Sequence, residues 1–155
     1  LNRDDIDIML EVKDKNLSAI KAINLTREDL KIKYLEEEWS RYKYLVLEHS
    51  KPSYDKIRSL LKEKREYPVL AFYDILERAL QMEGKPGDAE NAAKHVWGYF
   101  KDKASLDEKK QLERRIKQFR EGSGSLLSVK RYLWKLTLKY REPYLLSSYY
   151  FNEVM

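Results

Sequence analysis

The longest unbroken pattern in the chain is an apolar seam that advances in alternating steps of three and four residues. It consists of Ile32, Leu35, Trp39, Tyr42, Val46 and His49. Such steps keep side chains on one face of an α-helix, whereas a half-buried strand would need an alternation with a period of two. No segment alternates in that way, and the four prolines and five glycines fall mainly between apolar seams. The sequence therefore predicts an all-α fold.

Helix breakers and capping residues divide the chain into further helices. Ser105-Leu106-Asp107-Glu108 has the pattern of a capping box, and Thr26, with Glu28 and Asp29 after it, is predicted to cap the long helix. A length of 155 residues suits one hydrophobic core. We expect a single compact domain of seven or eight helices. Residues 1–35 are predicted to form an N-terminal helical extension that packs on a core domain of residues 36–155.

The composition and motifs exclude several kinds of site. The chain has no cysteine, which excludes a disulfide, a thiolate zinc site, a cysteine-ligated iron–sulfur cluster and a cysteine nucleophile. Gly84-Lys85 lacks the upstream glycine and the following serine or threonine of a phosphate-binding P-loop. No serine lies in a nucleophile-elbow setting, and the two histidines lack the spacing of a metal motif. We therefore expect no catalytic residue, no metal site and no cofactor.

Two features bear on where the protein acts. No apolar run approaches the roughly 20 residues that are needed to cross a bilayer. The first five residues, Leu1 to Asp5, are polar and acidic, unlike a secretory signal peptide. We expect a cytoplasmic protein with no membrane partner.

Basic charge is concentrated in the C-terminal third of the chain. Residues 94–141 contain fourteen Lys and Arg against five Asp and Glu, a net charge of +9, whereas the whole chain carries +5. Aromatic residues interleave with these cations from Lys130 onward, a combination that suits RNA because cations bind phosphates and exposed rings stack on unpaired bases. The predicted phosphate contacts are Lys94, Lys101, Arg131, Lys135 and Lys139. The alternative is a solvated helical surface with most tyrosine rings in the core.

A second group of candidate residues surrounds the two histidines. Asn91, His95 and Gly98 share one stripe of a predicted helix, and His49 ends the long apolar seam. Glycine inside a helix costs about 1 kcal/mol relative to alanine, so we expect another helix or a ligand to approach Gly98 closely. The predicted pocket comprises His49, Lys43, Asn91, His95, Gly98 and Tyr99, and it would bind an anion or shuttle a proton. The alternative is two structural histidines near the interior.

Three segments resemble the YbgA-like family of uncharacterised bacterial and archaeal domains. They are residues 41–50, the motif Asn91-x-x-x-His95-x-x-Gly98-Tyr99-Phe100-Lys101, and Pro143-Tyr144-Leu145. The resemblance runs from about Trp39 to the C-terminus and identifies residues 1–35 as an extension. One departure is Ser148, which stands where the family commonly has glutamine.

This resemblance implies a role beside another protein. Family members occur alone or behind a cysteine-rich domain of the thiouracil desulfidase type, which carries an iron–sulfur cluster and is linked to thiouridine in tRNA. By analogy, this protein would be a non-catalytic module that binds tRNA. It would serve a desulfidase-type iron–sulfur partner that is a separate protein. The alternatives are an enzyme or small-ligand domain that uses a His49–His95 pocket, and a protein-docking adaptor whose apolar stripe is Leu127, Trp134 and Leu138.

Overall fold

The computed structural model describes residues 17–64 and 66–155, and the described chain is helical with no strand. A first helical stretch covers residues 17–25. The helices that follow are α2 (Lys33–His49), α3 (Lys51–Lys62), α4 (Val69–Gln81), α5 (Pro86–Trp97), α6 (Leu106–Arg120), α7 (Leu126–Tyr140), α8 (Pro143–Leu146) and the 3₁₀-helix η1 (Tyr149–Phe151). In these residues, no helix is both long enough and apolar enough to span a bilayer.

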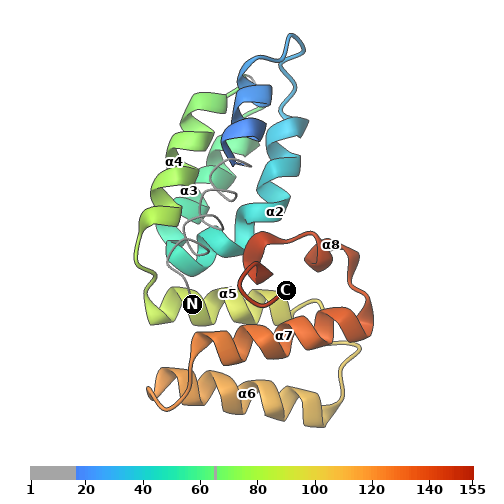
Figure 1. Cartoon of the computed structure of the whole chain (residues 1–155). Helices are drawn as coiled ribbons and strands as arrows, with labels where there is room; N and C mark the ends of the chain where they lie inside the picture. The colour runs from blue at the N-terminus through green and yellow to red at the C-terminus, as the bar shows by residue number, and fades with distance from the viewer. Residues whose placement is uncertain (1–16, 65) are drawn as a thin grey trace, which may run out of the picture.

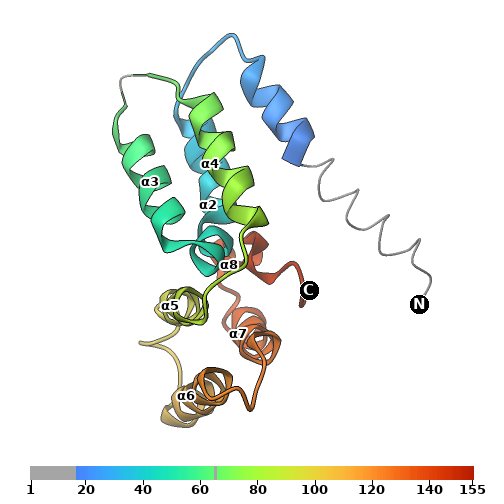
Figure 2. The same ribbon diagram turned by 90° about the vertical axis from the view of Figure 1, so that its left-hand side faces the viewer.

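The helices form two groups that cross each other (Figure 1). Residues 17–25, α2, α3 and α4 run lengthwise in the upper part of the view, whereas α5, α7 and α6 lie across the lower part. Figure 2 views the second group almost end-on, which shows that its three helices run side by side. Helix α5 contacts α2 on one side and α7 on the other, and α6 packs on α7. Helix α5 therefore joins the two groups.

The buried residues of both groups belong to one hydrophobic core, as predicted for a single all-α domain. The α2 seam supplies Leu35 and Val46, which are fully buried, and Trp39 and Tyr42, which are nearly so. Helix α5 packs through its small residues and Val96. The prediction of a compact all-α fold is confirmed.

The start of the long helix differs from the prediction. Thr26 does not cap α2, because its Oγ1 donates a hydrogen bond back to the carbonyl of Ala22 (2.9 Å) and closes the preceding helical turn. Helix α2 begins only at Lys33. In the link between the two helices, the Tyr34 hydroxyl donates to the Asp29 carboxylate (2.6 Å). Local side-chain bonds of this kind compete with helix formation, and Asp29 serves the link rather than a first helical turn.

The described part of the N-terminal segment packs against α4 and the link before it. The Asn24 amide donates to the Tyr73 hydroxyl (2.9 Å), and the Tyr67 hydroxyl donates to the Asn24 carbonyl (3.0 Å). Lys21 forms an ion pair with Glu77 (2.7 Å). Residues 1–16 of the predicted extension lie outside the described residues.

Helix α6 opens with the predicted capping box, which provides a test of its stability. The Ser105 hydroxyl accepts from the Glu108 backbone N–H (3.2 Å), and the Glu108 carboxylate accepts from the Ser105 N–H (2.9 Å). We expect Ser105→Ala to lower the free energy of unfolding by about 1 kcal/mol, measured by urea denaturation. Ser59→Ala, at an exposed position inside α3, is the control and should change it by less than about 0.5 kcal/mol. Equal losses in the two variants would contradict the capping role.

Candidate nucleic-acid interface

Three tyrosines from three different elements meet where α2, the turn after α5 and α8 come together. The hydroxyls of Tyr44 and Tyr99 lie 2.9 Å apart. The rings of Tyr99 and Tyr144 are stacked, with centroids 5.5 Å apart and an interplanar angle of 14°. Tyr44, which is buried, meets both rings edge-on. These contacts hold each ring in a defined orientation.

Cationic side chains border these rings. The Lys43 Nζ lies 4.8 Å from the ring centroid of Tyr44 and 5.0 Å from that of Tyr144. On α3, the Arg58 guanidinium lies 5.7 Å from the ring centroid of Tyr54. We refer to these side chains, with a histidine of α5, as the basic–aromatic cluster, which comprises Lys43, Tyr44, Tyr54, Arg58, His95, Tyr99 and Tyr144.

The pKa shifts indicate that Lys43, Arg58 and His95 lie near one another. Partial desolvation of its ring lowers the pKa of His95, although the side chain is exposed overall, and the charges of Lys43, Lys51 and Arg58 lower it further. Burial also lowers the pKa of Lys43, again with a contribution from Arg58. Among the described residues, Lys51 is ion-paired with Asp55, whereas Lys43, Arg58 and His95 form no ion pair. The lasting positive charges here are those of Lys43 and Arg58, and an anion placed near them would relieve their mutual repulsion.

The structure divides the predicted histidine pocket between two places. Lys43, His95 and Tyr99 belong to the basic–aromatic cluster. His49 does not, because its Nδ1 is bonded to the Met82 carbonyl (2.7 Å) and its side chain lines a separate cavity. Asn91 is half-buried on α5 and forms no side-chain hydrogen bond with a described residue.

Two expectations for α5 are wrong. His95 is exposed rather than near the interior, because α5 packs through Ala92, Ala93 and Val96 and turns its 91–95 stripe outward. Gly98 caps the end of α5, and within the described chain no atom of another helix lies closer than 4 Å to the position that a Cβ on Gly98 would take. A Cβ added to Gly98 would meet its own chain first, with the His95 carbonyl oxygen 3.0 Å away.

The predicted phosphate contacts are all exposed, but they differ in how they are paired. They are Lys94 and Lys101, on α5 and the turn after it, and Arg131, Lys135 and Lys139 on α7. Lys94 is ion-paired with Glu90 and Lys139 with Glu108, each at 2.6 Å. Hydrogen bonds from Lys139 and Tyr140 lower the pKa of Glu108 to about 2, which marks Lys139 as part of a structural ion pair. Arg131 and Lys135 have no ion pair within the described residues.

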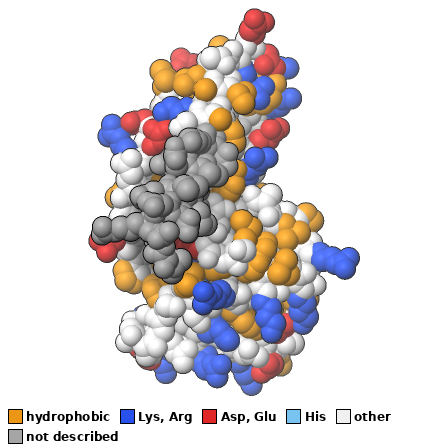
Figure 3. All heavy atoms as spheres, viewed as in Figure 1, with side chains coloured by type: hydrophobic (Ala, Val, Ile, Leu, Met, Phe, Trp, Pro, Cys, Tyr) orange, Lys and Arg blue, Asp and Glu red, His pale blue; other side chains and the backbone are white. Residues whose placement is uncertain are grey.

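One face of the molecule combines basic and apolar side chains (Figure 3). Lys and Arg gather over α6 and α7, and hydrophobic side chains gather above them over the C-terminal segment. The predicted apolar stripe of α7 is only partly exposed to solvent. Leu138 is 53% exposed, whereas Trp134 is half-buried with its ring centroid 5.1 Å from that of Phe151.

Comparison with known proteins identifies the family of this chain. Residues 43–154, about three quarters of the chain, match a family described as a protein of unknown function, DUF1722. This chain belongs to the DUF1722 family. The match confirms the resemblance to YbgA-like domains, because the chain is also 31% identical over 103 residues to the uncharacterized protein YbgA of Escherichia coli (strain K12), with 61% of each chain covered.

A second relative of this DUF1722 chain has a named activity. The chain is 32% identical over 150 residues to a UV DNA damage endonuclease of Clostridium perfringens (strain 13 / Type A). This match covers 95% of the chain but only 34% of the relative. The chain therefore spans about a third of the endonuclease and 61% of YbgA. No solved structure matches the chain.

Sequence reasoning missed part of the basic–aromatic cluster in this DUF1722 chain. Arg58 and Tyr54 lie on α3, whose position beside His95 depends on contacts between helices that are distant in sequence. Tyr144 carried a signal, since it belongs to the Pro143-Tyr144-Leu145 segment on which the family resemblance depended. Ser148, where the family has glutamine, is buried and bonds with its hydroxyl to the Arg41 carbonyl (3.4 Å). This position therefore faces the protein interior.

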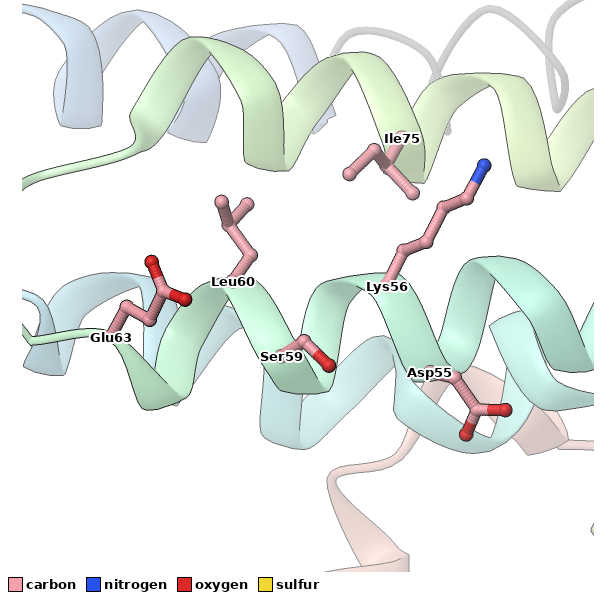
Figure 4. A pocket seen from close by; sticks show the side chains of 6 residues that line it. All are labelled: Asp55, Lys56, Ser59, Leu60, Glu63 and Ile75. Atoms are coloured by element: carbon pink, nitrogen blue, oxygen red, sulfur yellow. The ribbon is translucent and has the colours of Figure 1, made fainter.

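An open groove of about 430 Å³ lies between α3 and α4 (Figure 4). Leu60 and Ile75 point toward each other across it, and Lys56 extends from α3 toward α4. Its lining includes no histidine, and its three charged residues, Asp55, Lys56 and Glu63, are exposed. Over the described residues, no group of three or more His, Asp or Glu side chains could hold a metal ion.

Proposed function

We propose that this chain is a non-catalytic nucleic-acid-binding module that contacts phosphates through the basic–aromatic cluster. One observation carries the proposal: Lys43 lies 5.0 Å from the Tyr144 ring, which stacks on Tyr99, and it forms no ion pair in the described chain. Arg58, also without an ion pair there, lies near enough for its charge to act on both Lys43 and His95. Lys and Arg side chains supply the salt-dependent affinity for a phosphate backbone. Aromatic rings beside them suit unpaired bases, which stack on aromatic side chains in single-stranded complexes.

The family relationship supports the same ligand class. The Clostridium perfringens relative is named for DNA damage, and the family resemblance implies tRNA. Because both nucleic acids present a phosphodiester backbone, the cations alone do not separate them. The aromatic part of the cluster favours unpaired segments, and we take tRNA as the ligand, with a desulfidase-type iron–sulfur protein as the partner served. Binding of duplex DNA in preference to tRNA would overturn this choice of ligand.

Helix α7 supplies the second proposed contact. Arg131 and Lys135 are exposed and lack an ion pair within the described chain, so their charge is available to a phosphate. Lys94 and Lys139 would have to leave Glu90 and Glu108 before they could bind one. We therefore propose that Arg131 and Lys135 contribute more to the affinity than the two paired lysines.

Reversal of one charge in the cluster tests the proposal. Arg58→Glu should weaken tRNA binding roughly tenfold and reduce the slope of log affinity against log salt concentration by about 1, because one phosphate contact is lost. The measurement is fluorescence anisotropy with labelled tRNA across a salt series.

The matched control for this experiment is Lys56→Glu. It makes the same charge change on the same helix, but Lys56 extends toward α4 beside the groove of Figure 4. We expect its effect on affinity to be much smaller than that of Arg58→Glu. Equal losses in the two variants would show that only the net charge of the protein matters, and the cluster would no longer be the binding site.

A further inference from the structure

A cavity of about 230 Å³ lies apart from the basic–aromatic cluster. It is bordered by the end of α2, the segment between α4 and α5, the first turn of α5, and the facing ends of α6 and α7. Its lining residues are Glu48, His49, Gly84, Pro86, Ala89, Phe119 and Leu126. Gly84 and Pro86 are exposed, so the cavity reaches the surface. It therefore combines apolar walls with two polar residues, the usual character of a small-ligand site.

The orientation of His49 fixes what it offers to a ligand. Its Nδ1 lies 2.7 Å from the Met82 carbonyl oxygen, which can only accept a hydrogen bond. The Nδ1 must therefore carry the proton, and in the neutral ring the Nε2 is left as an acceptor. The structure records no other hydrogen bond of this ring with a described residue. A bound molecule would meet an acceptor that is held in place by the backbone.

The charge of Glu48 is already compensated. Its carboxylate lies 3.1–3.2 Å from the Nζ of Lys130, whose side chain is only 1% exposed. A buried carboxylate without a cation would call for a cationic ligand, but here the cation is supplied by the protein. The cavity therefore suits a neutral molecule rather than an amine.

Phe119 provides an aromatic wall of the cavity. Of the four phenylalanines in the chain, Phe72, Phe100 and Phe151 each pack against another aromatic ring. The half-buried Phe119 has no aromatic neighbour among the described residues. The volume also constrains the ligand, since a cavity of about 150 Å³ accommodates benzene and drug-sized molecules need about 300 Å³ or more. One planar ring system fits between these limits.

We propose that this cavity binds a single neutral planar heterocycle that stacks on Phe119 and donates an N–H to the Nε2 of His49. Nucleic-acid bases have this chemistry, because their edges carry N–H donors and their faces stack on aromatic side chains. A free base and a base that projects from a bound strand present the same groups. Binding of a base that projects from a bound strand rests on the proposed function, whereas binding of a free base does not.

The two histidines allow the proposal to be tested by NMR. We would follow the imidazole signals, assigned with a His95→Asn variant, while adding 9-methyladenine. Signals of His49 should shift with roughly millimolar affinity, as expected for a ligand of this size, and those of His95 should remain unchanged. The N6,N6-dimethyl analogue, which has no N–H donor, should bind at least about tenfold more weakly.

Two variants separate stacking on Phe119 from general hydrophobic contact. Phe119→Leu keeps an apolar wall but removes the ring, and it should weaken binding of 9-methyladenine about tenfold. Leu106→Ala removes an apolar side chain that is 78% exposed at the start of the same helix, and it should leave the affinity unchanged. An unmoved His49 signal, or equal affinities for the two variants, would overturn the base site.

Addition of tRNA distinguishes the base site from the proposed function. If tRNA shifts the His95 signals while 9-methyladenine leaves His49 unmoved, the nucleic-acid module stands and the base site fails. If 9-methyladenine shifts His49 and tRNA affects neither histidine, the cavity is a small-molecule site and the nucleic-acid function fails.

Discussion

Lys130→Met should lower the free energy of unfolding by about 3–5 kcal/mol, the largest effect that we expect from a single substitution in this chain. Lys130 on α7 is buried, and its Nζ contacts the Glu48 carboxylate on α2. It also lies 4.7 Å from the ring centroid of Tyr150 and 3.5 Å from the Glu153 carboxylate. Burial raises the pKa of Glu48 even with this lysine beside it. Without the lysine, the carboxylate would stay buried without a compensating charge.

Urea denaturation of the single variant and of Lys130→Met/Glu48→Leu would identify the cause of the loss. The double variant replaces both charges by apolar groups, and buried ion pairs replaced in this way often lose little stability. We therefore expect it to regain most of the lost free energy of unfolding. A double variant that is as unstable as Lys130→Met would assign the loss to the packing of the lysine chain instead of the unpaired charge.

The second large effect is expected at Gly84, where the segment after α4 crosses the end of α2. A Cβ at this position would lie 2.7 Å from the backbone carbonyl oxygen of Glu48. Because the obstacle is backbone rather than a flexible side chain, one of the two segments has to move. Gly84→Ala should therefore lower the free energy of unfolding by about 2 kcal/mol, measured by urea denaturation.

Gly87 gives a control of opposite sign for this substitution. It lies in the first turn of α5, and a Cβ added there would meet nothing within 4 Å. Gly87→Ala should raise the free energy of unfolding by about 0.4–1 kcal/mol, because it restricts the unfolded chain and favours the helix. A loss of stability in Gly87→Ala as large as that in Gly84→Ala would show that the close approach to Glu48 is not the reason.

Most of the helices could be predicted because their signals are local. The α2 seam, the Ser105 capping box and the breaks at proline each depend on residues within one or two turns of each other. Thr26 shows the limit of such reasoning, since its hydroxyl can bond backward as well as forward and only the surrounding contacts decide. Thr26 therefore closes the end of one helix instead of capping the start of the next.

The candidate site was less accessible to sequence reasoning. The sequence places Lys130 among the surface cations. In the structure it is buried and bonded to the carboxylate of Glu48, which is 82 residues away in the sequence. His49 and His95 were assigned to one pocket because both follow apolar patterns, yet the packing face of α5 turns His95 outward. The way in which the helices cross decides which charged side chains meet. The periodicity within one helix does not predict how that helix crosses its neighbours.

The ion pair between Glu48 and Lys130 also has a consequence for how the molecule opens. It connects α2 in the lengthwise group with α7 in the crosswise group, and α5 packs against both helices. If the two groups separated while each stayed helical, Glu48 in the lengthwise group and Lys130 in the crosswise group would each lose the partner of its buried charge. Partial opening at this junction is therefore as unfavourable for one group as for the other. The crossed helices should exchange their protected amide hydrogens as one cooperative unit rather than as two.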